Sequence, residues 1–128
     1  EAAEHTVSPR DADAEPGLAE WASMQAPTAG YAEQVFYHDI PADDDGFARI
    51  RLLSPATRLE VEVAHRKAEL PVLVQWKMMG QGAYVTGLEP ANCRVGGRAA
   101  ELERGPHCIL EPGQTRSFEV RISIRKSD

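Results

Sequence analysis

One carboxylate stands out as a candidate for chemistry because of its place in the chain. Residues 75–80 and 84–92 have the pattern of two strands joined by a glycine turn, and Glu89 ends the second strand directly before Pro90. Proline cannot extend a central ladder, and the loops at strand ends are where β-sandwiches place ligand-binding groups. Glu89 is therefore a candidate base or hydroxyl-binding group. The alternative is that it ends a strand in solvent, where most glutamates lie.

The elements that must position Glu89 are strands. Apolar and polar residues alternate in residues 59–63 and again in 118–125, which places one side of each strand in a core and the other in water. Further candidate strands cover residues 35–38, 47–53, 72–77, 83–88 and 107–110. Turns that contain glycine or proline separate them. Seven short strands at nearly regular spacing predict an all-β fold, an antiparallel β-sandwich.

The amino-acid composition disfavours several classes of binding partner. The 128 residues fit one domain, and 20 acidic against 14 basic residues give a net charge of −6, which disfavours nucleic acid and anionic membranes as partners. Apolar runs such as residues 71–74 are only a few residues long, whereas a membrane-spanning helix needs about 20. Cys93 and Cys108 have no zinc-type spacing. We expect two free thiols in the cytoplasm, and neither a metal nor a cofactor.

The amino-terminal segment has a different character. Alanines and acidic residues are frequent in it, prolines interrupt it, and only Leu18, Trp21 and Met24 follow a helix-like spacing. No signal peptide is visible. We expect residues 1–29 to be an irregular connecting arm with one short helical turn, typical of a connection inside a larger protein. Residues 30–128 are expected to form the β-sandwich.

Two segments near the carboxyl end resemble the aldose 1-epimerase (galactose mutarotase) superfamily. They are residues 87–92, with the sequence GLEPAN, and 109–114, with the sequence ILEPGQ. In that superfamily a strand ending in Glu-x-x-Asn or Glu-x-Gln carries the catalytic glutamate, and a Leu-x-Pro-Gly turn leads into the last strand. Upstream, residues 30–35 resemble the segment that supplies a sugar-binding acid, and residues 70–76 resemble the strand before the catalytic one.

The match extends over nearly the whole chain. Residues 75–78 resemble the Gln/Leu-Trp-Arg/Lys-Met motif of an uncharacterised bacterial subfamily of epimerase-like proteins. The resemblance implies that residues 30–128 are the carboxy-terminal part of a larger domain, a galactose mutarotase-like supersandwich.

The resemblance also implies roles for individual residues. Glu89 matches the general base that takes the proton of the anomeric hydroxyl so that the sugar ring opens. Either Glu33 or Gln34 matches the hydroxyl-binding acid, and both remain open. The general acid of the superfamily is a histidine expected upstream of this chain. The histidines present do not match that motif, although His38 could face the same pocket.

Further sugar-binding residues are expected around the base. Trp76 is expected to stack on the apolar face of a pyranose, the alternative being a buried core aromatic. Gln75 and Lys77 could bind hydroxyls, and Asn92 could orient Glu89. Because Trp76 and Lys77 are consecutive, a regular strand allows only one of them to face the pocket.

Three functions therefore remain open at this level. The first is an aldose 1-epimerase, or mutarotase, that acts on a free or phosphorylated monosaccharide, in which this chain alone is inactive. The second is a carbohydrate-binding module without the acid, and the third is a structural sandwich without a ligand. Arg94 and Arg98 are expected to be solvated, with a contact to a sugar phosphate as the alternative. Open sheet edges also predict self-association.

Overall fold

The computed structural model describes residues 4–105 and 109–126. Strands dominate these residues. In chain order they are β1 (Thr6–Pro9), β2 (Gln34–Asp39), β3 (Phe47–Ser54), β4 (Leu59–Arg66), β5 (Val72–Gly80), β6 (Ala83–Ala91) and β7 (Val120–Lys126). A 3₁₀ helix, η1 (Glu15–Glu20), and a short α-helix, α1 (Arg98–Arg104), complete the described secondary structure. None of the helices in the described residues is both long and apolar enough to cross a membrane.

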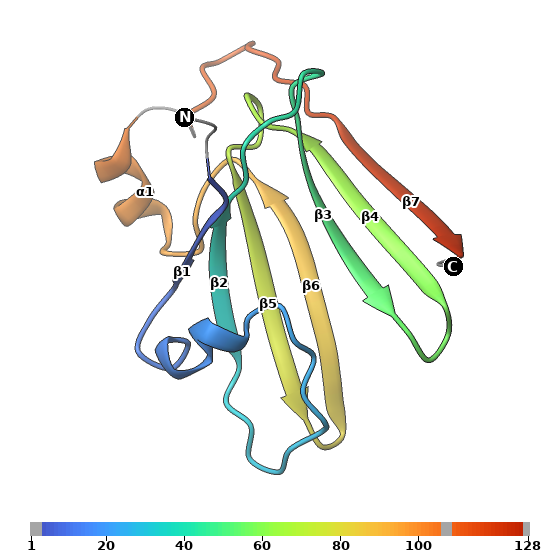
Figure 1. The fold of residues 1–128 in the computed structure, drawn as a ribbon. Helices are drawn as coiled ribbons and strands as arrows, with labels where there is room; N and C mark the ends of the chain where they lie inside the picture. The colour runs from blue at the N-terminus through green and yellow to red at the C-terminus, as the bar shows by residue number, and fades with distance from the viewer. Residues whose placement is uncertain (1–3, 106–108, 127–128) are drawn as a thin grey trace.

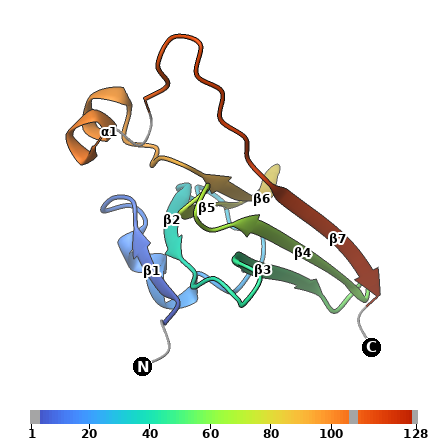
Figure 2. The ribbon, with the colours of Figure 1, turned by 90° about the horizontal axis from the view of Figure 1, so that it is seen from above.

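The strands form two antiparallel sheets (Figure 1). One sheet has the order β1-β2-β5-β6 and the other has the order β3-β4-β7. Viewed from above, the sheets lie as two layers, with β3 and β4 beneath β5 and β6 (Figure 2). Side chains from both layers meet in the cluster of Ile40, Ala48 and Leu73, against which Ile50 and Leu88 pack. Burying an aliphatic side chain of this size contributes about 1.5–3 kcal/mol, so this contact joins the layers.

This architecture confirms the predicted antiparallel β-sandwich. The strands expected at residues 35–38, 47–53, 72–77 and 83–88 each lie within an observed strand. Sequence patterns did not indicate β1 or α1. Ile109 and Leu110 lie outside any strand, and His107, expected in the same strand, is outside the described residues.

The amino-terminal segment contributes to the sandwich. Four residues of β1 pair with β2 and form an edge of the first sheet, and η1 begins at Glu15, ahead of the expected turn at residues 18–24. Alternation cannot identify so short a strand, because four residues hold only two per face. The arm then runs back along the sheet to Thr28, whose N–H donates to the carbonyl oxygen of Met79 at 2.9 Å.

The β3-β4-β7 sheet exposes apolar side chains at its β7 edge. Val120, Ile122 and Ile124 pair with β4 residues that lie on the side of the first sheet, yet their exposed fractions are 45%, 68% and 68%. In Figure 1, β7 is the strand of its sheet that lies farthest from the first sheet. The exposed fractions show that the first sheet does not cover these three side chains. Self-association through this region stays a prediction.

Candidate functional site

Strand β5 divides the predicted site residues between the two faces of its sheet. Leu73 packs against the β3-β4-β7 sheet, so Gln75 and Lys77, at alternate positions, share this inner face. Val74 and Trp76 point the opposite way, to the outer face, where they pack in a separate apolar cluster. Trp76 and Lys77 therefore point to opposite faces, as expected for consecutive residues of a strand, and of the two only Trp76 lies on the outer face.

Glu89 lies on this outer face. It pairs across the sheet with Val74, and Gly87 pairs with Trp76. The Glu89 side chain is exposed, and its Oε1 lies over Gly87, where the Cβ of any other residue would collide with it. Gly87 therefore leaves the space that the carboxylate occupies. Glu89 and Trp76 stand in adjacent cross-strand rows, so the carboxylate and the indole are neighbours.

Glu33 reaches the same face from the start of β2. The indole Nε1–H of Trp76 donates to Oε2 of Glu33 at 2.9 Å, and the Nη2 of Arg10 donates to Oε1 at 3.4 Å. Trp76 is also in register with Val35. These bonds fix the orientation of the indole ring beside the row that contains Glu89.

Tyr37 and Arg94 complete the outer face. Sequence reasoning did not assign Tyr37 to the site, and for Arg94 it gave a contact to a sugar phosphate only as the alternative to solvation. Tyr37 pairs with Val74, and Val74 pairs with Glu89, so Tyr37 and Glu89 end one row that spans two strand spacings, roughly 9.5 Å. The guanidinium carbon of Arg94 stands 4.7 Å from the centroid of the Tyr37 ring. The alternation in β2 predicts that Tyr37 shares a face with Val35. That Tyr37 lies in one row with Val74 and Glu89 follows only from the strand pairing.

The outer face thus combines aromatic rings, carboxylates and one cation over an apolar floor. Trp76 and Tyr37 flank Val74, which is 2% exposed, and Glu33 and Glu89 supply hydrogen-bond acceptors. Aromatic surface with a few convergent polar groups suits a ligand that has both an apolar face and hydroxyl groups.

His38 has a different environment, because it points to the inner face. Its Nε2 lies 3.1 Å from Oε1 of Gln75, and its Nδ1 lies 3.0 Å from Nε2 of His5. An amide oxygen can only accept, so the hydrogen of neutral His38 is on Nε2 and Nδ1 accepts from His5. Gln75 in turn donates to the carbonyl oxygen of Trp21 at 3.0 Å. Burial lowers the pKa of His38 from 6.5 to about 4, which keeps the ring neutral at neutral pH.

Lys77 is fully buried on the inner face and binds the arm. Its Nζ donates to the carbonyl oxygens of Glu20 at 2.9 Å and Ser23 at 2.7 Å. Burial also lowers the pKa of Lys77. The carbonyls at a helix end have no partner within the helix. Lys77 is the hydrogen-bond donor for the carbonyl at the end of η1, and this bond fastens the arm to β5.

Gln34 and Asn92 also lie away from Glu89. The Nε2 of Gln34 donates to the carbonyl oxygen of Asp13 at 3.4 Å, and its Oε1 accepts from the hydroxyl of Tyr31 at 2.8 Å. Of the two residues considered for the hydroxyl-binding acid, Glu33 is thus the one beside Trp76. Asn92 follows the end of β6 and lines a separate cavity of about 350 Å³.

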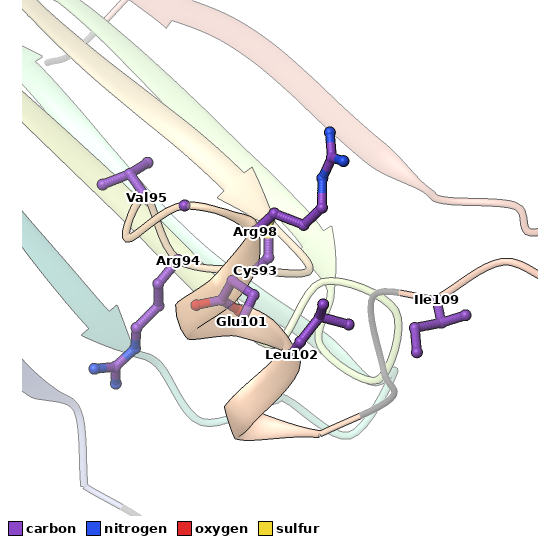
Figure 3. Close-up of a pocket in the computed structure, with 8 residues that line it drawn as sticks. Cys93, Arg94, Val95, Arg98, Glu101, Leu102 and Ile109 are labelled. Carbon is purple, nitrogen blue, oxygen red and sulfur yellow. The ribbon is translucent and has the colours of Figure 1, made fainter.

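A second cavity lies beyond β6. Figure 3 shows three of the side chains that line this cavity: Cys93, which precedes α1, and Glu101 and Leu102, which belong to α1. Its volume is about 500 Å³. Cys93 is a free thiol, and Cys108 is outside the described residues. Across residues 4–105 and 109–126, no group of three His, Cys, Asp or Glu side chains is placed to hold a metal ion.

The model of the family described as "Domain of unknown function (DUF4432)" matches residues 1–124, and the chain belongs to that family. No curated protein matches the chain significantly.

A solved structure gives the second comparison. The chain is similar to the crystal structure of a candidate aldose 1-epimerase from Klebsiella pneumoniae subsp. pneumoniae, with a TM-score of 0.86 and 26% sequence identity. The alignment covers 94% of this chain and 32% of that chain. The chain therefore has an aldose 1-epimerase-like β-sandwich fold, and it spans about a third of the solved protein.

Proposed function

We propose that this chain forms the part of an aldose 1-epimerase-like protein that holds a monosaccharide against Glu89. The observation that carries the proposal is the shared outer face, on which Glu89, Trp76 and Glu33 lie in adjacent positions. A pyranose that stacks on Trp76 would present its hydroxyls to the two carboxylates. We also propose that the chain belongs to the bacterial subfamily with the Gln-Trp-Lys-Met motif and that the protein is cytoplasmic.

In this proposal Glu89 is the general base. It takes the proton of the anomeric hydroxyl while the bond between the anomeric carbon and the ring oxygen breaks. The Glu89 side chain is exposed, so its carboxylate is open to a sugar bound on this face. A positioned base contributes roughly 10²–10⁴ in rate. The bond between Glu33 and Trp76 would hold the sugar-stacking surface in place during the step.

The ring oxygen also needs a proton donor, which we infer comes from another segment. Among the described residues, His38 and His65 are each 1% exposed and lie inside the sandwich, and His5 binds His38. His107 is outside the described residues. The similar solved protein is about three times as long as the matched region, which leaves room for a donor elsewhere in such a protein.

The lack of a histidine on the outer face of the described residues favours a second candidate, a carbohydrate-binding module without turnover. Polarimetry of the complete protein with a panel of aldoses separates the two functions. An epimerase accelerates the approach to anomeric equilibrium, whereas a binding module changes only the chemical shifts of the bound sugar in NMR. Neither acceleration nor binding for any aldose would contradict both candidates and leave a structural sandwich.

A further inference from the structure

A cavity of about 370 Å³ lies at one end of the outer face. Thr6 and Ser8 of β1 line it from one side, and Val72 and Arg94 line it from the other. Tyr37, which pairs with Ser8, forms part of the lining as well. Since Tyr37 ends the row that contains Glu89, the cavity continues the proposed sugar site.

Arg94 lines this cavity as well as the cavity beside α1. In Figure 3, Arg94 extends away from α1 toward the end of β2, whereas Arg98 extends to the opposite side. The guanidinium group stacks on Tyr37. Stacking leaves the N–H edge of a guanidinium available for a planar pair of oxygens, so such an arginine suits carboxylate or phosphate.

The charge of the cavity is positive. Lys67 is compensated, because its Nζ lies 2.5 Å from Oδ1 of Asp39 and 2.5 Å from the carbonyl oxygen of Pro71. Arg94 makes no ion pair with any carboxylate of residues 4–105 and 109–126. His38, which also borders the cavity, is neutral at neutral pH. One uncompensated cation therefore faces a space lined by hydroxyl groups.

We propose that Arg94 selects monosaccharide derivatives that carry an anionic group, a carboxylate or a phosphate, on the exocyclic carbon of the ring. This inference rests on the proposed function. Tyr37 and Glu89 are roughly 9.5 Å apart along one row, and a pyranose over Val74 places its anomeric hydroxyl at Glu89. Its exocyclic group then points to Tyr37 and Arg94.

The test compares charged with neutral sugars in the complete protein. The ratio of kcat/KM for glucuronate over glucose, and for glucose 6-phosphate over glucose, is measured for wild type, Arg94→Gln and Arg98→Gln. We expect Arg94→Gln to lower at least one ratio by about 10- to 100-fold, consistent with the loss of a charge-assisted pair. The matched control Arg98→Gln, on the far side of the loop, should leave both ratios unchanged. The ratio that falls identifies carboxylate or phosphate.

Different outcomes would overturn the anion subsite and the epimerase activity. If wild type interconverts glucose and Arg94→Gln changes neither ratio, the anion subsite is overturned and the epimerase proposal stands. If no sugar is interconverted, calorimetric titration with glucuronate and inorganic phosphate decides. Binding that Arg94→Gln weakens at least tenfold supports the subsite. Equal binding by wild type and variant, or no binding, overturns it.

Discussion

Folding stability should depend on pH through His38. Its pKa is about 4 in the folded chain against the ordinary 6.5, so between these values the unfolded chain binds a proton that the folded chain does not. The contribution of His38 to the free energy of unfolding is therefore complete above pH 6.5 and is lost as the pH falls toward 4. Linkage gives a loss of about 2 kcal/mol at pH 5 and about 3 kcal/mol at pH 4.

His38→Gln isolates this contribution, because the new amide can still donate to Gln75 but does not titrate. Urea unfolding of both proteins at about pH 8 and about pH 5 should show a loss that is about 2 kcal/mol larger for wild type. Burial also lowers the pKa values of His5 and His65, but both residues remain in the two proteins. Equal losses in wild type and variant would refute the reasoning. So would an NMR titration in which the wild-type His38 ring protonates near 6.5, its ordinary pKa.

Two further substitutions follow from the contacts of the sheet. Lys77→Met leaves the carbonyl oxygens of Glu20 and Ser23 without their donor, so we expect a loss of about 1–3 kcal/mol and faster proteolysis within residues 11–25. Unchanged cleavage rates would contradict the role of Lys77 in fastening the arm. Gly87→Ala places a Cβ against Oε1 of Glu89, and because that flexible side chain can turn aside, the urea midpoint should hardly change. Anomer interconversion by the complete protein should nevertheless fall at least about tenfold, since a misplaced base loses much of its effect. Wild-type activity in this variant would show that the observed position of Glu89 is not the working one.

Much of the fold could be predicted from local patterns. Period-two alternation predicted β4 and β7 because each strand has one apolar and one charged side, as in Val61 and Val63 against Glu60 and Glu62. The same pattern could not predict β1, which is short, or α1, which has no clear apolar face.

The division of the site between two faces was harder to predict. The sequence showed that Trp76 and Lys77 point in opposite directions, but not which of them faces a ligand. Lys77 is buried because backbone carbonyls of an irregular arm surround it, and such partners leave no signature in side-chain patterns. Tyr37 enters the site through its pairing with Val74, and strand register is a long-range property.

The central claim, that Glu89 is the base for anomer interconversion, is tested most directly by Glu89→Gln in the complete protein. Glutamine keeps the shape and hydrogen-bonding capacity of the side chain but cannot take the proton. Glu103→Gln, at an exposed position on α1, is the matched control. With the aldose that wild type converts fastest, we predict that Glu89→Gln lowers the polarimetric rate by roughly 10²-fold or more and changes sugar affinity less than about tenfold. Equal rates for wild type and Glu89→Gln would contradict the claim.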